Sequence, residues 1–215
     1  MPDFPTIKVP QKDPQPVPTE SFEKMFAKAT DAEMRAFILC GWLAGLRLNE
    51  ALHLEREAND KFPYLDLLHD RIVIPAEFAK AVRDQWVPLD PDLRAALEAL
   101  PDHGVRVFDF QGPNGDRVGL RAVGARVIRL ARLAGVKITM KTLRHGFGCY
   151  HAARQPAQVL QKLMRHANIS TTMAFYANVD DAVEAAVRNG RALNRALNNR
   201  ENETETNDEG IDGTL

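Results

Sequence analysis

The spacing of apolar residues predicts a chain that is mostly helical. Apolar positions that recur every three or four residues mark one face of an α-helix. This pattern predicts helices over residues 20–29, 31–44, 49–54, 90–100, 118–134, 141–154, 156–164, 170–177 and 180–198. Segment 118–134 is the clearest case, because Val123, Val127, Leu130 and Ala134 line one side while its arginines point elsewhere.

Polar residues near the helix starts predict the caps. Thr30 and Glu33 have the spacing of a capping box, in which each side chain accepts a backbone N–H at the helix start. Asn49 and Ser170 are predicted to cap two later helices in a similar way. Gly45 is expected to end helix 31–44, so that Arg47 falls in the following turn.

Short runs rich in β-branched and aromatic residues predict three strands in the middle of the chain. The runs are YLDLL (64–68), RIVIP (71–75) and QWVPL (85–89). Their short connections favour an antiparallel sheet, with Lys80 in the hairpin connection between the second and third strands. The predicted fold class is therefore mainly α with a small antiparallel β-sheet (α+β).

Charge and proline content divide the chain into three segments. Residues 1–18 are rich in proline and lack apolar periodicity, so an extended leader or linker is expected. Residues 19–198 carry the predicted elements and form the expected folded domain. Residues 199–215 are expected to be a disordered acidic tail, because they contain six acidic residues and almost no apolar group. Removing these six charges changes the formal net charge from −1 to +5.

Composition excludes several classes of protein. The sequence is 45% hydrophobic and 27% charged, as in soluble globular domains. It has no signal-peptide pattern and no apolar run near the ~18 residues of a membrane span. Cys40 and Cys149 lie in apolar, helix-like sequence without metal-ligand spacing, which indicates reduced core residues of a cytoplasmic protein.

Positive charge is concentrated in one block of the sequence. No acidic residue occurs between Asp116 and Asp180. The same interval contains eleven basic residues: Arg117, Arg121, Arg126, Arg129, Arg132, Lys137, Lys141, Arg144, Arg154, Lys162 and Arg165. Charge this one-sided favours an anionic partner, and we expect that partner to be DNA phosphate.

Taken singly, the candidate site residues have ordinary structural explanations. Arg47 is typical of a surface residue at a helix end, although its apolar surroundings, LAGLRLNEAL, leave its charge in need of a partner. Lys80 alone is typical of a solvated hairpin, and a lone Tyr176 more often packs in a core than acts as a nucleophile. His145 and His166 lie 21 residues apart with no third ligand nearby, which makes metal binding a poor interpretation.

Taken together, four segments resemble the catalytic domain of the tyrosine recombinases (phage integrases). They are GLRLNEALHL around Arg47, AKAVRDQWVPL around Lys80, KTLRHGF around Arg144, and LMRHANISTTMAFYANV around His166 and Tyr176. Their order and intervals match the family over about residues 20–198. The resemblance implies the DNA breaking–rejoining fold and a site-specific recombinase or integrase that cleaves and rejoins DNA through a covalent 3′-phosphotyrosine.

The resemblance assigns catalytic roles to Arg47, Lys80, Lys141, Arg144, His166 and Tyr176. Planar guanidinium groups of the two arginines suit the two non-bridging oxygens of a phosphodiester. Tyr176 would attack phosphorus with help from His166, and Lys80, with Lys141 as backup, would protonate the leaving 5′ oxygen. This chemistry needs no metal, ATP or other cofactor, and the sequence has no Walker-type glycine loop.

The chain departs from the family pattern at several positions. Lys141 stands where the family signature commonly has His, and Gly146 and Arg165 replace the usual Thr and Gly. The commonest spacing puts the tyrosine at position 175, which is Phe here, so Tyr176 matches a variant spacing. The family's N-terminal DNA-clamping domain has no counterpart, as expected for an excised catalytic domain or a minimal member.

Double-stranded DNA is the expected partner. Phosphate contacts are assigned to Arg121, Arg126, Arg129, Arg132, His145 and Arg165. The resemblance further implies a homo-oligomer (dimer or tetramer) on DNA, accessory DNA-bending proteins, no membrane and a place at the nucleoid. Helix 180–198 is expected to dock on a neighbouring protomer or to pack within its own chain.

Three alternatives stay open at this stage. One is a relaxing enzyme like the type IB topoisomerases, and another is a non-catalytic DNA-binding relic of the same fold, which Phe175 favours. The third is an RNA- or phosphate-binding helical protein without strand transfer, which would leave Lys80 on its hairpin unexplained.

Overall fold

The structure, a computed structural model, describes residues 14–176. The predicted helix 180–198, the acidic tail 199–215 and most of the leader 1–18 lie outside the described residues. Within 14–176, no helix is both long enough and apolar enough to cross a lipid bilayer.

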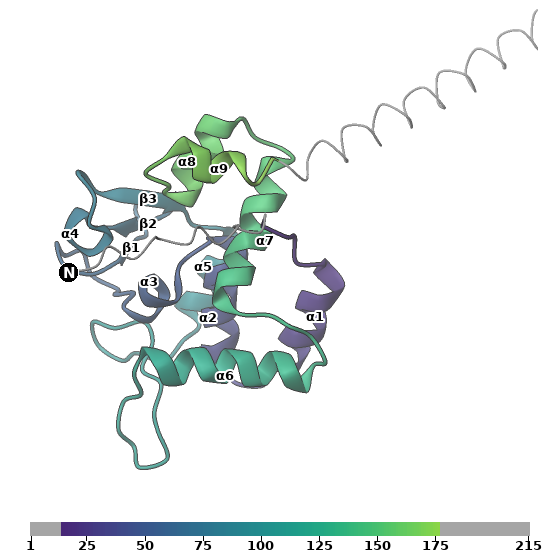
Figure 1. The fold of residues 1–215 in the computed structure, drawn as a ribbon. Helices are drawn as coiled ribbons and strands as arrows, with labels where there is room; N and C mark the ends of the chain where they lie inside the picture. The colour runs from purple at the N-terminus through teal and green to yellow at the C-terminus, as the bar shows by residue number, and fades with distance from the viewer. Residues whose placement is uncertain (1–13, 177–215) are drawn as a thin grey trace, which may run out of the picture. The chain divides into compact units, whose positions relative to one another are not determined.

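The described elements follow the predicted order, with a three-stranded sheet inserted among helices (Figure 1). The elements are α1 (Thr19–Lys28), α2 (Ala32–Leu43), α3 (Leu48–Leu52), β1 (Tyr64–Asp66), β2 (Arg71–Ile74), α4 (Ala76–Ala79), β3 (Gln85–Pro88), α5 (Pro91–Glu98), α6 (Leu120–Leu133), α7 (Met140–Ala152), α8 (Ala157–Met164) and α9 (Ile169–Met173). The prediction of a mainly helical α+β fold is confirmed.

Helix α2 lies in the middle of the described fold because it is apolar on nearly all sides. Phe37, Ile38 and Cys40 have no exposed surface. Helices α5 and α7 both pack against α2. The approach of α7 is close at Gly41, where an added Cβ would lie 3.1 Å from the Cβ of Leu143. A helix buried on several sides needs this uniform hydrophobicity rather than one apolar stripe.

The sheet is antiparallel in the order β1–β2–β3, as predicted. Its register pairs Ile72 with Leu65 on one side and with Val87 on the other. All three of these residues are buried, so one face of the sheet joins the core. The connection between β2 and β3 is not a plain hairpin, because it contains the short helix α4, which ends at Lys80.

Helix α6 and three helix caps differ in detail from the sequence predictions. The fully buried stripe of α6 is Val123, Val127 and Ala131, whereas Leu130 and Ala134 are only half-buried. Three caps were predicted at the wrong residue. Helix α2 is capped by the Asp31 carboxylate rather than Thr30, α3 by the side chain of Glu50 rather than Asn49, and α9 by Asn168 rather than Ser170.

The two cysteines are both free thiols, and only one lies in the core. Cys40 is completely buried in α2, as predicted. Cys149 is half-buried, and its Sγ lies 3.6 Å from the carbonyl oxygen of Pro14.

Gly45 forms the turn that joins α2 to α3, and it ends α2 as predicted. Its φ is +57°, a conformation that side chains with a Cβ rarely adopt. An added Cβ would also lie 2.5 Å from Cδ1 of Phe147 on α7. The turn therefore needs glycine for two reasons, and it leaves the Gly45 carbonyl available to side chains from other elements.

Gly45→Ala is expected to lower the free energy of unfolding by about 2–4 kcal/mol, because backbone strain adds to overpacking against Phe147. Gly135→Ala is the matched control, since Gly135 has φ +71° and no atom within 4 Å of an added Cβ. It should cost only about 1 kcal/mol. Urea denaturation measures both values, and equal losses would show that Phe147 does not constrain the turn.

Candidate active site

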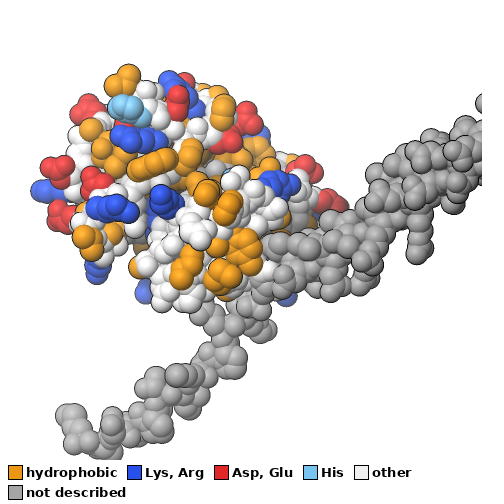
Figure 2. Space-filling model, turned by 90° about the horizontal axis from the view of Figure 1, so that it is seen from above, with side chains coloured by type: hydrophobic (Ala, Val, Ile, Leu, Met, Phe, Trp, Pro, Cys, Tyr) orange, Lys and Arg blue, Asp and Glu red, His pale blue; other side chains and the backbone are white. Residues whose placement is uncertain are grey.

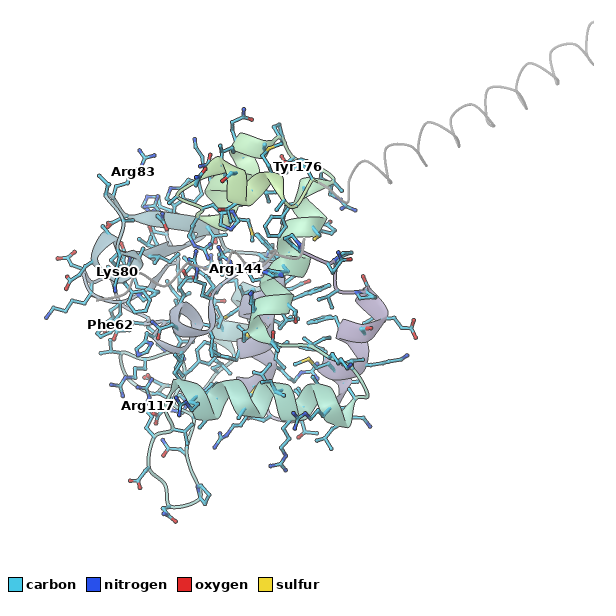
Figure 3. All side chains as sticks on the ribbon, viewed as in Figure 1. Phe62, Lys80, Arg83, Arg117, Arg144 and Tyr176 are labelled. Carbon is cyan, nitrogen blue, oxygen red and sulfur yellow. The ribbon has the colours of Figure 1, made fainter. Side chains whose placement is uncertain are left out.

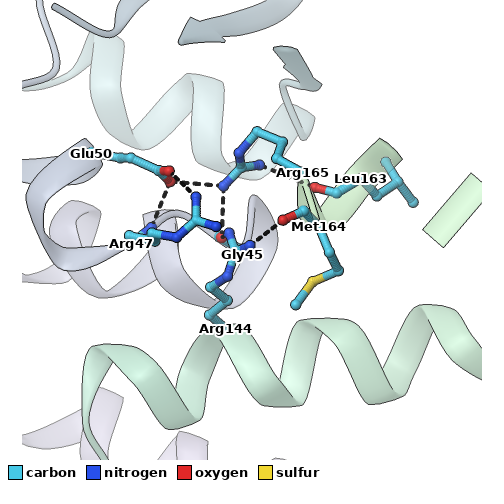
Figure 4. A network of polar contacts seen from close by, with 7 residues as sticks. All are labelled: Gly45, Arg47, Glu50, Arg144, Leu163, Met164 and Arg165. Carbon is cyan, nitrogen blue, oxygen red and sulfur yellow. Dashed lines mark hydrogen bonds and ion pairs between the residues drawn. The ribbon is translucent and has the colours of Figure 1, made fainter. Parts of the chain in front are cut away.

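The site is organised around Glu50, a buried carboxylate on α3 that is 3% exposed (Figure 4). Arg47 lies at the start of α3, and its backbone N–H donates to Oε2 of Glu50 at 2.8 Å. The Arg47 guanidinium donates to the other carboxylate oxygen, Oε1, at 2.5 Å. One carboxylate thus caps the helix and orients the arginine, whose own side chain stays 47% exposed.

Arg144 reaches the same point from α7. Its guanidinium donates to the carbonyl oxygens of Gly45 and Met164, so that one fork ties the α2–α3 turn to the end of α8. The residue is 6% exposed. Arg144 can therefore meet a ligand only at the edge of its guanidinium, and its orientation is set by these two acceptors.

Arg165 is the third arginine of this centre, and its side chain is only 1% exposed. It ends α8 in a left-handed conformation, φ +53°. Its Nη2 donates to Glu50 Oε2 at 2.8 Å and to the Gly45 carbonyl at 3.0 Å, and its Nη1 donates to the Leu163 carbonyl at 3.1 Å. The sequence predicts a contact between Arg165 and DNA phosphate, whereas in the structure this side chain is enclosed by protein and its donors bond to Glu50, Gly45 and Leu163.

The charges at this centre do not cancel. Burial alone would raise the pKa of Glu50, but the charges of Arg165, Arg47 and Arg144 outweigh burial and lower that pKa to about 2. Burial lowers the pKa of Arg144 and of Arg165, yet a guanidinium stays protonated in proteins. Three guanidinium groups therefore face one carboxylate, which leaves two positive charges in excess.

His166 lies beside the arginines and borders a cavity of about 590 Å³ that Lys141, Arg144 and His145 also line. Its Nδ1 is 3.0 Å from Oγ1 of Thr172. Burial lowers the pKa of His166 to about 4, with Arg144, Arg47 and Arg165 adding to the effect. The imidazole is therefore neutral near pH 7. Burial, Lys141 and Arg144 lower the pKa of His145 as well.

A second cavity, of about 1010 Å³, adjoins the first at His166. Its lining includes Arg47, Lys80 and Arg165. Lys80 is exposed and has φ +51°, which turns the chain between α4 and β3. Figure 3 shows Lys80 on the sheet side of the centrally placed Arg144. The two cavities together form the candidate cleft, and five of the six predicted catalytic residues lie at it.

The sixth, Tyr176, lies elsewhere. Its hydroxyl donates to the Gln155 carbonyl at 2.5 Å, it lines neither cavity, and burial raises its pKa. Phe175 takes the place in the cleft, with its ring centroid 5.9 Å from that of His145 and 5.8 Å from that of His166. Gly148 makes room for this ring, because an added Cβ would lie 2.3 Å from Phe175 Cε1.

The arginines of α6 are not part of the cleft. Arg121, Arg129 and Arg132 are exposed, and Arg126 donates to the Gln111 carbonyl. None of the four lines either cavity. As for metals, residues 14–176 contain no group of three or more His, Cys, Asp or Glu side chains arranged to hold an ion.

The sequence analysis missed the role of Glu50 and the space beside Gly148, here called the slot, that the ring of Phe175 occupies. A signal for Glu50 was present, because it is the sole charged residue besides Arg47 in LAGLRLNEAL and follows it at helical spacing. A carboxylate in so apolar a segment needs a buried cation. The slot had no such signal, since Gly148 and Phe175 meet only in the folded chain.

These features define a class of protein: a helical domain with a small three-stranded antiparallel sheet, whose cleft presents the arginines, lysines and neutral histidine that suit a phosphodiester. On the face seen in Figure 2, Lys and Arg side chains lie among hydrophobic ones, with Asp and Glu side chains also present. Residues 18–182 match the model of the Phage integrase family, and the chain belongs to this family.

Individual relatives agree with this assignment. The chain is 27% identical to the tyrosine recombinase XerA of Thermococcus kodakarensis over 177 residues. This matched region covers 78% of this chain and 60% of that protein. Its fold is similar to the crystal structure of XerA recombinase, with a TM-score of 0.65 and 20% identity over 85% of this chain and 67% of that one. It is also similar to the Tn1549 transposon integrase in complex with transposon right end DNA, with a TM-score of 0.60 and 18% identity over the same shares.

Glu50→Gln is expected to lower the free energy of unfolding near pH 7 by about 3–5 kcal/mol, because it leaves buried arginines without their counter-ion. A carboxylate whose pKa is lowered on folding stabilises the protein above its unfolded pKa and loses this effect as the pH falls toward the folded value. The gap between wild type and Glu50→Gln should therefore shrink between about pH 4.5 and 2.

Denaturation curves at several pH values measure this gap. Glu20→Gln is the control, because Glu20 forms only an exposed ion pair with Lys24 and should change stability little. A gap that stays constant down to pH 2 would contradict the assigned role of Glu50.

Proposed function

We propose that this chain is the DNA-cleaving and rejoining domain of a site-specific recombinase or integrase that acts through a covalent 3′-phosphotyrosine. The supporting observation is the convergence of Arg47 and Arg144 from different elements beside His166, with two positive charges in excess. The chain spans about 60% of the length of the curated relative described above, so the activity of the whole protein is part of this proposal.

The arginines would bind the two non-bridging oxygens of the scissile phosphate. Arg47 offers an exposed guanidinium that Glu50 already orients, and Arg144 offers the edge that faces the cavity. The phosphodiester carries one negative charge, and a second develops when a tyrosine oxygen attacks phosphorus. Fixed positive charges in a site that excludes water stabilise such a transition state more than water does, because they need no reorganisation.

Tyr176 would supply the nucleophile after leaving the Gln155 carbonyl. Its oxygen would form a bond to phosphorus while the bond from phosphorus to the 5′ oxygen breaks. Neutral His166 can accept the phenol proton. Burial and the nearby arginines lower its pKa to about 4, and a bound phosphate would oppose the contribution of the arginines. Lys80, or Lys141 across the cleft, would donate a proton to the 5′ oxygen.

DNA is proposed as the substrate, at the nucleoid. The Tn1549 integrase is recorded in complex with DNA, and it has a similar fold. The exposed arginines of α6 suit contacts with phosphates outside the cleft, which add affinity and salt dependence without reading sequence. A homo-oligomer on DNA and accessory DNA-bending proteins belong to the same proposal.

A non-catalytic relic is the second candidate, because Phe175 occupies the cleft and Tyr176 is held outside it. A suicide substrate distinguishes the two. Wild-type protein incubated with nicked duplexes of randomised sequence around the nick should form protein–DNA adducts that resist denaturing electrophoresis. Tyr176→Phe should form none, because it lacks the attacking oxygen.

Each other outcome of the trapping experiment has one meaning. Adducts that persist in Tyr176→Phe would show that another residue is the nucleophile. No adduct with the wild type would favour the relic. In a separate assay on supercoiled plasmid, relaxation without recombinant product would favour the topoisomerase-like enzyme.

Arg144→Lys is expected to slow adduct formation by about 10²–10³-fold, because lysine keeps the charge but loses the paired donors of the guanidinium. Truncation to alanine is less informative, since it would leave the Met164 carbonyl without this donor. Arg154→Lys, just beyond the end of α7, is the control, because Arg154 is exposed and lines neither cavity. Unchanged single-turnover rates in Arg144→Lys would show that this arginine acts only in folding.

A further inference from the structure

We propose that Arg165 is a positioning residue that holds Glu50 without contacting DNA, so that Glu50 can orient Arg47 but does not neutralise the phosphate site. This inference rests on the proposed recombinase function. The hydrogen bonds of Arg165 support this role.

Arg165 and Arg47 divide one carboxylate between them. Arg47 bonds to Oε1 of Glu50 through its side chain, and Arg165 bonds to Oε2. If Arg165 were absent, Glu50 would form its ion pair with Arg47 alone, and that pair would have no net charge. Because Arg165 is present, the carboxylate has a second, enclosed counter-ion, and Arg47 keeps a positive charge on its 47% exposed side chain.

The net charge decides how well the centre matches the transition state. Arg47, Arg144 and Arg165 against Glu50 leave two positive charges, and the transition state of phosphoryl transfer carries two negative ones. Replacing Arg165 by an uncharged residue would leave a single positive charge on this group of residues, while Lys80 and Lys141 elsewhere in the cleft would keep theirs. The bound phosphodiester in the ground state carries only one negative charge, so the loss affects the transition state more than DNA binding.

The hydrogen bonds allow this role to be separated from a purely structural one. Every acceptor of Nη2 has another donor: Gly45 also accepts from Arg144, and Glu50 Oε2 also accepts from the Arg47 backbone N–H. The Arg165 Nε is buried and has no hydrogen-bond partner among the described residues. Arg165→Met would therefore remove an unsatisfied donor and leave only the Leu163 carbonyl without this partner.

The test is a double-mutant cycle on the full chain. Arg165→Met should slow single-turnover adduct formation with a nicked duplex recovered from the randomised pool by about 10²-fold. Its affinity for the intact duplex should change less than about threefold, because many other phosphates contribute to binding. Adding Glu50→Gln to Arg165→Met restores two positive charges, and the double variant should react at least about tenfold faster than Arg165→Met alone.

Two further variants serve as references. Arg165→Lys keeps the charge and should recover part of the rate. Arg94→Met removes an arginine that forms exposed pairs with Asp70 and Glu98 and lines neither cavity, so it should react like the wild type. A structural role for Arg165 predicts the opposite of rescue, since the double variant would then be no faster than Arg165→Met.

A second readout needs no DNA. Orthovanadate at about pH 9, where it carries two negative charges as the transition state does, should raise the melting temperature of the wild type and of the double variant more than that of Arg165→Met. Equal shifts in all three proteins, or an unimpaired adduct rate in Arg165→Met, would overturn the charge proposal. Failure of the wild type to form any adduct would instead count against the recombinase function, and the orthovanadate comparison would still decide the role of Arg165.

Discussion

The structure of the cleft depends on a buried carboxylate surrounded by guanidinium groups. Glu50 is taken out of water at a cost that only close cations can offset. Arg47, Arg144 and Arg165 provide them, and each comes from a different part of the chain. Because Gly45 accepts hydrogen bonds from two of these arginines, the α2–α3 turn, α7 and α8 are held at one point. A shift of any one of these elements would expose a buried charge to solvent or leave it without its hydrogen-bond partner.

This arrangement is poorly optimised for stability and well suited to binding an anion. A buried centre that carries excess positive charge repels itself when empty, and apolar residues in its place would be expected to stabilise the fold. Local violations of this kind are expected at functional sites. The neutral His166 fits the same environment, because burial lowers the pKa of the imidazole and the nearby guanidinium charges add to this effect.

The proposed nucleophile, Tyr176, directly follows the residue that enters the cleft. Phe175 and Tyr176 are neighbours in the turn after α9, and their side chains have different contacts. The ring of Phe175 enters the slot beside Gly148 and leaves the Tyr176 hydroxyl at the Gln155 carbonyl. The apolar ring of Phe175 packs against the imidazoles of His145 and His166. Under the proposed function, Tyr176 would have to leave the Gln155 carbonyl and take a place beside the bound phosphate.

The sequence by itself determined the order of helices and strands and the list of cleft cations. Both depend on patterns within a few residues: apolar spacing for α6 and the sheet, and short motifs around Arg47, Lys80, Arg144 and His166. What the tertiary structure decided concerns partners that are distant along the chain. Arg165 and Glu50 are 115 residues apart, and Arg144 and Gly45 are 99 apart. No local pattern shows whether an arginine is enclosed or exposed, because burial is a property of the surfaces that meet. For that reason the sequence placed Arg165 on DNA, and only the folded chain placed it on Glu50.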